Sequence, residues 1–142
     1  MNEPENPIMR MLSAYGAAIL AKDVDAFVAL YDKDTRVFDM WNEWSYDGVE
    51  AWREMATAWF HTLGDERVAV DVDDVRSIVG HDVAAAHAFV TYKGLSADGK
   101  TLRAVRNRLT WTLRRSGGTW KIVHEHTSAP VDFETSKLIF PH

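Results

Sequence analysis

The strongest constraint on the fold is a change in hydrophobic periodicity about halfway along the chain. In the first half, apolar residues recur every three or four positions, the spacing that places them on one face of a helix. From Val68 onward, apolar and polar residues alternate, which places every second side chain on the same face of a β-strand. Helices followed by a run of strands predict an α+β fold in which the helices cover one face of a sheet.

Three helices are expected in the first half. The first follows Pro7 and ends near Lys22, and the second starts from the N-cap residue Asp23 and ends at residues 32–34. The third opens at residues 47–50, a segment close to a capping box. Their apolar faces are Ile8, Met11, Leu12, Tyr15 and Ile19 in the first helix; Val24, Phe27, Val28 and Tyr31 in the second; and Val49, Trp52, Met55, Ala56, Trp59 and Leu63 in the third.

The strands of the second half are separated by turn residues. The expected strands run from residue 68 onward and over 83–93, 101–115 and 119–128, with turns at 80–82, 94–99 and 116–118. These turns predict a continuous antiparallel meander, and a further strand is expected earlier, at 36–41. We expect residues 1–142 to form a single domain, with the apolar tail at 131–142 packing on the domain or on a partner subunit.

Composition excludes several classes of function. The formal net charge of -5 leaves no basic face for a nucleic acid backbone, and no apolar run is long enough to cross a membrane. The sequence starts without the features of a secretion signal, so we expect a cytoplasmic protein. It has no cysteine, which excludes a disulfide framework and a cysteine nucleophile but is compatible with any redox compartment. It contains six Trp, whereas an average chain of this length would hold about two, and this excess predicts a large apolar pocket or interface.

Two stretches of the chain resemble a known superfamily. Residues 22–31, KDVDAFVALY, resemble the second helix of the ketosteroid-isomerase-like proteins, and residues 120–128, WKIVHEHTS, resemble the last strand of the SnoaL-like branch and of the calcium/calmodulin-dependent kinase II association domain. The resemblance implies the cystatin-like cone of the nuclear transport factor 2-like proteins, a strongly curved antiparallel sheet packed on three N-terminal helices. It also implies a homodimer formed through the outer face of the sheet, and chemistry without a cofactor.

Resemblance to ketosteroid isomerase places the general base of that enzyme at Asp39 and its oxyanion-hole tyrosine at Tyr15. That family also uses a protonated Asp, but residues 106–112, where it would lie, contain no carboxyl group. The alternative is that Tyr15 is a core residue with a hydrogen-bonded hydroxyl and that Asp39 ends a strand in solvent.

His124 and His126 lie two positions apart on the last expected strand, so their side chains share a face. Facing a pocket, they form an acid-base pair that titrates near neutrality, whereas Glu125 points to the other face. Alternatively they belong to the inner face of the strand and bond buried polar groups. A metal would need a third ligand such as His87, and we predict no metal site.

The register of the last hairpin decides whether Arg108 and Thr110 share the face of these histidines. A two-residue turn at Gly117 and Gly118 places them on the opposite face, whereas a three-residue turn that includes Ser116 places them beside the histidines in the pocket. Segregation of apolar residues favours the first register, and the family resemblance favours the second. Arg108 and Thr110 are therefore candidate substrate-binding residues.

The other candidates for substrate binding are aromatic or apolar. Trp52, Met55 and Trp59 lie on the third helix, where such residues belong either to the core or to a ligand pocket. Trp41 and Trp44 flank a polar loop at the end where a cone of this type opens, a place suited to a ligand or partner contact.

Two functions are consistent with these residues. The first is a cofactor-independent isomerase, cyclase or dehydratase that transfers a proton on a small hydrophobic carbonyl compound, with Asp39 or His124 as base and Tyr15 or Arg108 polarising the oxygen. The second is a non-catalytic module for ligand binding or oligomeric association. Burial of Asp39 in a pocket discriminates between them.

Overall fold

The computed structural model describes residues 6–141. Its elements follow the expected order of two helices, an early strand, a third helix and a run of strands, with one further short strand before the third helix. The helices are α1 (Pro7–Ala21), α2 (Val24–Val28) and α3 (Val49–Leu63). The strands are β1 (Tyr31–Phe38), β2 (Tyr46–Asp47), β3 (Arg67–Val79), β4 (Val83–Leu95), β5 (Thr101–Ser116) and β6 (Thr119–Ser128). The predicted α+β class is confirmed.

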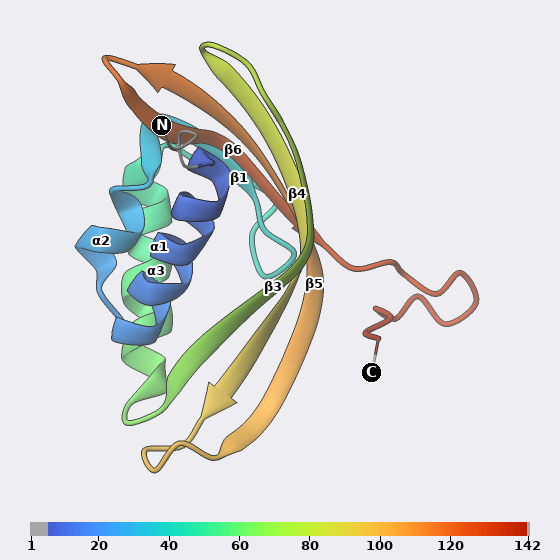
Figure 1. Ribbon diagram of the computed structural model, residues 1–142. Helices are drawn as coiled ribbons and strands as arrows, with labels where there is room; N and C mark the ends of the chain where they lie inside the picture. The colour runs from blue at the N-terminus through green and yellow to red at the C-terminus, as the bar shows by residue number, and fades with distance from the viewer. Residues whose placement is uncertain (1–5, 142) are drawn as a thin grey trace.

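One curved sheet holds all of these strands, in the order β2-β1-β6-β5-β4-β3. Strands β3 to β6 form the expected antiparallel meander, but β1 runs parallel to β6, so the sheet is mixed. The three helices lie against its concave face (Figure 1). Among residues 6–141, no helix is long and apolar enough to span a bilayer.

The ends of the helices follow local capping chemistry. Asn6 and Asp23 each accept a backbone N–H bond at the starts of α1 and α2, as expected for N-cap residues. The second helix is shorter than predicted, because it ends at Val28 and Tyr31 already begins β1. The side chain of Tyr31 is buried, which satisfies the helical pattern although its backbone is extended.

The predicted capping box at the start of α3 is wrong. The N-cap residue is Gly48, which has a φ of 91° that favours glycine and no side chain to bond the helix. Asp47 instead lies in the short strand β2, where it accepts a hydrogen bond from Arg36 Nε at 2.8 Å. Asp47 therefore belongs to the edge strand of the sheet, although the sequence pattern predicted it as a cap of the helix.

A β-bulge in β6 determines which side chains enter the concave face. The hairpin between β5 and β6 turns at Gly117 and Gly118, with Leu113 opposite Ile122. The register then shifts, so that Thr112 lies opposite His124 and Val123 is the extra residue. The alternation reverses beyond this point: Glu125 and Thr127 are buried with Leu109 and Trp111, whereas Arg108, Thr110, His124 and His126 lie on the other face.

The tail after β6 leaves the convex side of the sheet (Figure 1). A bridge between Val131 and Leu138 closes a turn in which Asp132 Oδ1 accepts two backbone N–H bonds. Phe140 stacks on Trp41 with ring centroids 6.1 Å apart, whereas Phe133 at the turn is 99% exposed. The described part of the tail therefore contacts its own domain through one aromatic pair and leaves other apolar side chains in solvent.

Candidate functional site

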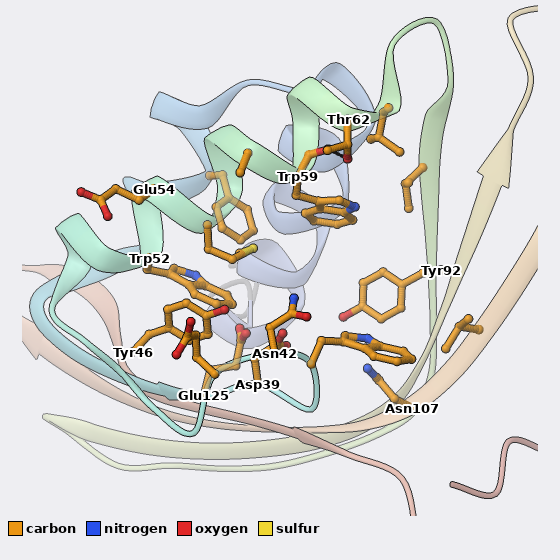
Figure 2. Close-up of a pocket in the computed structure, with 18 of the residues that line it drawn as sticks. Asp39, Asn42, Tyr46, Trp52, Glu54, Trp59, Thr62, Tyr92, Asn107 and Glu125 are labelled. Carbon is orange, nitrogen blue, oxygen red and sulfur yellow. Dashed lines mark hydrogen bonds between the residues drawn. The ribbon is translucent and has the colours of Figure 1, made fainter. Parts of the chain in front are cut away.

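A cavity of about 870 Å³ lies between α3, the concave face of the sheet and the loop after β1 (Figure 2). Its volume falls in the range of small-molecule sites. The residues that line it are Tyr15, Phe27, Asp39, Trp41, Asn42, Glu43, Ser45, Tyr46, Ala51, Trp52, Glu54, Met55, Ala58, Trp59, Thr62, Leu63, Val68, Tyr92, Gly94, Arg103, Val105, Asn107 and Glu125. Carboxyl groups and aromatic rings are thus enclosed together.

The structure brings together six of the residues singled out in the sequence. They are Tyr15, Asp39, Trp41, Trp52, Met55 and Trp59, all of which line the cavity. Trp44, from the same loop as Trp41, is 95% exposed and is not among the lining residues. The loop after β1 therefore contributes one of its two tryptophans to the site.

His124 and His126 are not in the cavity, which corrects the expectation that they face a pocket. They lie on the other face of the sheet, where Phe38 contacts both rings edge-on, at centroid distances of 4.9 and 5.6 Å. Arg108 and Thr110 share that face, and Arg108 Nε donates to Ser128 Oγ. The two-residue turn agrees with the first predicted register, but the bulge then moves the histidines to the face of Arg108.

Asp39 follows the last residue of β1 and is half-buried at the cavity. Its Oδ1 accepts a hydrogen bond from Thr127 Oγ1 at 3.0 Å, and the same hydroxyl accepts the backbone N–H of Met40. Burial raises the pKa of Asp39, although the bonds from Thr127 and from the backbone act in the opposite direction. A carboxyl group of raised basicity thus lies where a ligand can reach it.

Glu125 is a second carboxyl group in the cavity, although strand periodicity predicted that it would lie on the opposite face. Tyr31 Oη and Trp111 Nε1 both donate to its Oε1, at 2.6 and 2.8 Å. Burial nevertheless raises the pKa of Glu125 to about 7, with a smaller contribution from the nearby charge of Asp39. The period of β6 alone could not have identified this residue, because the bulge interrupts it.

Two tyrosines form a hydroxyl pair beside these acids. Tyr15 Oη and Tyr92 Oη are 2.8 Å apart, and either one can be the donor. Burial raises the pKa of both phenols, so both are neutral near pH 7 and able to donate a hydrogen bond. Tyr92 occupies the predicted strand 83–93, but nothing in its sequence context distinguished it from a core residue.

The cavity also contains polar atoms that lack partners. In residues 6–141, the buried side-chain atoms without a hydrogen bond include Trp52 Nε1 and Asn107 Oδ1, and both residues line the cavity. Asn107 comes from the segment where the resemblance required a protonated Asp. Its Nδ2 donates to Met40 Sδ, at 3.5 Å. An acceptor and a donor are therefore left for a ligand.

No cluster of three or more His, Cys, Asp or Glu side chains suited to a metal occurs in the part of the chain that the structure describes. The side chains that line the cavity supply several kinds of reactive and binding group. These include two carboxyl groups of raised pKa, a neutral tyrosine pair and an aromatic wall.

Comparisons with solved structures agree with this architecture. An NTF2-like protein of unknown function from Pseudomonas putida is 24% identical, with a TM-score of 0.83, covering 95% of this chain and 92% of that one. Aln2 from a Streptomyces species is 16% identical, with a TM-score of 0.78 and coverage of 90% and 93%. A candidate calcium/calmodulin-dependent protein kinase II association domain from Xanthomonas campestris is 18% identical, with a TM-score of 0.72 and coverage of 91% and 89%.

Identities this low establish similarity of fold and not of activity. No curated protein matches the chain. The family model described as a SnoaL-like domain matches residues 8–132, which include every helix and strand from α1 to β6 apart from the first residue of α1. The chain belongs to the SnoaL-like domain family, and its fold is similar to that of solved NTF2-like proteins and of proteins with a cystatin-like fold.

Proposed function

We propose that the protein is a cofactor-independent enzyme that transfers a proton on a small hydrophobic carbonyl compound. The observation that carries the proposal is the presence of Asp39, with its raised pKa, in one cavity with the Tyr15–Tyr92 pair. A solvent-exposed Asp39 would have favoured the non-catalytic alternative.

The proposed reaction begins with the ionised Asp39 carboxylate. It takes a proton from the carbon next to the substrate carbonyl, and the electron pair of that C–H bond moves to the carbonyl oxygen, which becomes an enolate. A hydroxyl of the Tyr15–Tyr92 pair donates a hydrogen bond to this oxygen, where the negative charge develops. Asp39 then returns the proton to carbon, and Glu125 offers a second proton donor and acceptor in the same cavity.

The proposal can be tested without knowledge of the natural substrate. The protein should accelerate exchange of the α-protons of 1-tetralone, a cyclic hydrophobic ketone, with deuterium from solvent, measured by proton NMR. Replacing Tyr15 with Phe removes one hydroxyl of the pair, and we expect the exchange rate to fall on the order of 10²-fold. Trp44→Phe, outside the cavity, is the control and should retain the rate. Exchange no faster than in buffer, for this ketone and for cyclic enones, would contradict the proposal.

A homodimer formed through the outer face of the sheet is our second proposal, and it applies equally to a non-catalytic association module. Phe89 supports it, because this ring is 38% exposed on β4 and the guanidinium of Arg106 lies over it, 5.1 Å from the centroid. Apolar side chains that stay exposed on a sheet often mark an interface.

Sedimentation equilibrium should therefore give twice the 16.1 kDa mass of one chain. The variant Phe89→Asp should shift the protein to the monomer, because it places a carboxylate in the interface. Leu20→Asp is the matched control: Leu20 is 40% exposed on α1, away from the sheet, so this variant should stay dimeric. A monomeric wild type, or dissociation by both variants alike, would refute this mode of association.

A further inference from the structure

The charges around the cavity are unbalanced. Its lining holds four acidic residues, Asp39, Glu43, Glu54 and Glu125, and one basic residue, Arg103. Arg103 is half exposed and its Nη1 lies 2.7 Å from Glu66 Oε1, so its charge is already paired with a carboxylate. The cavity therefore presents a negative potential to a molecule that enters it.

The innermost acids lie together beside an aromatic ring. Asp39, Glu125 and Tyr46 are close to one another in Figure 2. Burial raises the pKa of Tyr46, and the charges of Asp39 and Glu43 raise it further. The charge of Asp39 likewise contributes to the raised pKa of Glu125. These carboxylates repel each other's charge, and in residues 6–141 neither Asp39 nor Glu125 forms an ion pair. A positive charge between them would relieve that repulsion.

Two further observations point to a cationic ligand. Asn107, a residue 6% exposed, lines the cavity, and its buried Oδ1 accepts no hydrogen bond in residues 6–141. The rings of Trp41, Trp52 and Trp59 also line the cavity, and an aromatic face attracts a cation within about 6 Å of its centroid. An ammonium group has three donors and no acceptor, so it complements both features.

We propose that the ligand carries a protonated aliphatic amine beside its apolar body, and that the cavity selects against carboxylates and phosphates. The inference rests on the proposed function and narrows its substrate to a carbonyl compound that also contains a basic amine. The ammonium group lies by Asp39, Glu125 and Asn107, and the apolar body lies against the tryptophans.

A matched set of three probes tests this inference. They are 2-(naphthalen-2-yl)ethylamine, 2-(naphthalen-2-yl)ethanol and the carboxylate (naphthalen-2-yl)acetate. They share an apolar body and are positively charged, neutral and negatively charged, respectively. Isothermal titration calorimetry at pH 8 should give the tightest binding for the amine, at least 10-fold tighter than the alcohol, and the weakest for the acetate. At pH 6 the amine should bind more weakly than at pH 8, because Glu125, with a pKa of about 7, is then mostly protonated, whereas the affinity of the alcohol should not change.

The variant Glu125→Gln keeps an oxygen to accept the bonds from Tyr31 and Trp111 but removes the charge. It should reduce the affinity for the amine at pH 8 about 10-fold, leave that for the alcohol unchanged and abolish the difference between pH 6 and pH 8 for the amine. Asp65→Asn, an exposed carboxylate after α3, is the control that should change none of these values.

Other outcomes separate this inference from the proposed function. Equal affinity for amine and alcohol, or tightest binding of the acetate, would overturn the inference. The proposed function would still stand if 1-tetralone exchanges its α-protons at the wild-type protein. Failure of all three probes to bind would overturn the inference as well, and exchange of 1-tetralone would then decide the proposed function alone.

Discussion

Replacing Asp39 with Asn should reduce the rate of α-proton exchange about 10²- to 10⁴-fold, the usual contribution of a general base. The amide cannot take a proton from carbon near neutral pH, but its oxygen can still accept the hydrogen bond from Thr127, so the local geometry is kept. Exchange of 1-tetralone protons, followed by NMR in deuterated buffer, measures the loss directly.

Stability distinguishes this catalytic role from a structural one. Burial raises the pKa of Asp39 in the folded protein, so its charged form opposes folding at neutral pH. Asp39→Asn should therefore unfold at the same or a higher denaturant concentration at pH 7. Asp47→Asn removes an exposed carboxylate just outside the cavity and should retain the wild-type exchange rate. Full activity of Asp39→Asn would exclude Asp39 as the base.

Ionisation of Glu125 should make the protein less stable as the pH rises. Because the folded state raises the pKa of Glu125 from an ordinary 4.5 to about 7, the folded state binds this proton more tightly than the unfolded chain. The stabilisation is complete below about pH 4.5 and is lost as the pH rises to about 7, which corresponds to a decrease on the order of 3 kcal/mol in the free energy of unfolding.

Urea denaturation between pH 4.5 and 8 measures this effect when the wild type is compared with Glu125→Gln. Burial also raises the pKa of Asp39, which adds to this trend, whereas hydrogen bonds lower the pKa values of Glu66 and Asp132, which produces the opposite trend at the acid end of the range. Those contributions are common to both proteins and cancel in the difference. The wild type should lose stability relative to Glu125→Gln as the pH rises and should reach a constant difference above pH 7. A difference that is constant over the whole range would show that Glu125 does not titrate there.

The sequence predicted the parts of the fold that depend on local periodicity. The buried faces of the helices, the hairpin turns and the meander all follow from short-range patterns of apolar, glycine and capping residues. Tyr31 shows the limit of such patterns, since burial fits either a helix or a strand and its extended backbone depends on pairing with β6. Asp47 shows another limit. It was expected to cap a helix, but it lies in β2, where it pairs with Arg36 of β1.

Site residues could be predicted from the sequence where they lie on a regular helix whose buried face is clear from its periodicity. Tyr15 and Trp52 lie on helices whose inner faces were clear, and the structure places both residues at the cavity. Glu125 was missed because its orientation depends on one inserted residue, and the register of a strand is a long-range property. Asn107 was not recognised as a site residue because a lone amide in a strand has no distinguishing pattern.

Because β6 contains a bulge at Val123, the position of that bulge decides which of two sets of side chains in this strand lines the cavity. With the bulge before them, Glu125 and Thr127 face inward; with the bulge moved beyond them, His124 and His126 would take their places. A related protein with the bulge farther along this strand would have an imidazole site in place of the carboxylate site, with the same side chains in the same order. Divergence of chemistry within such a fold can thus arise from the position of a bulge in a strand rather than from the composition of the strand.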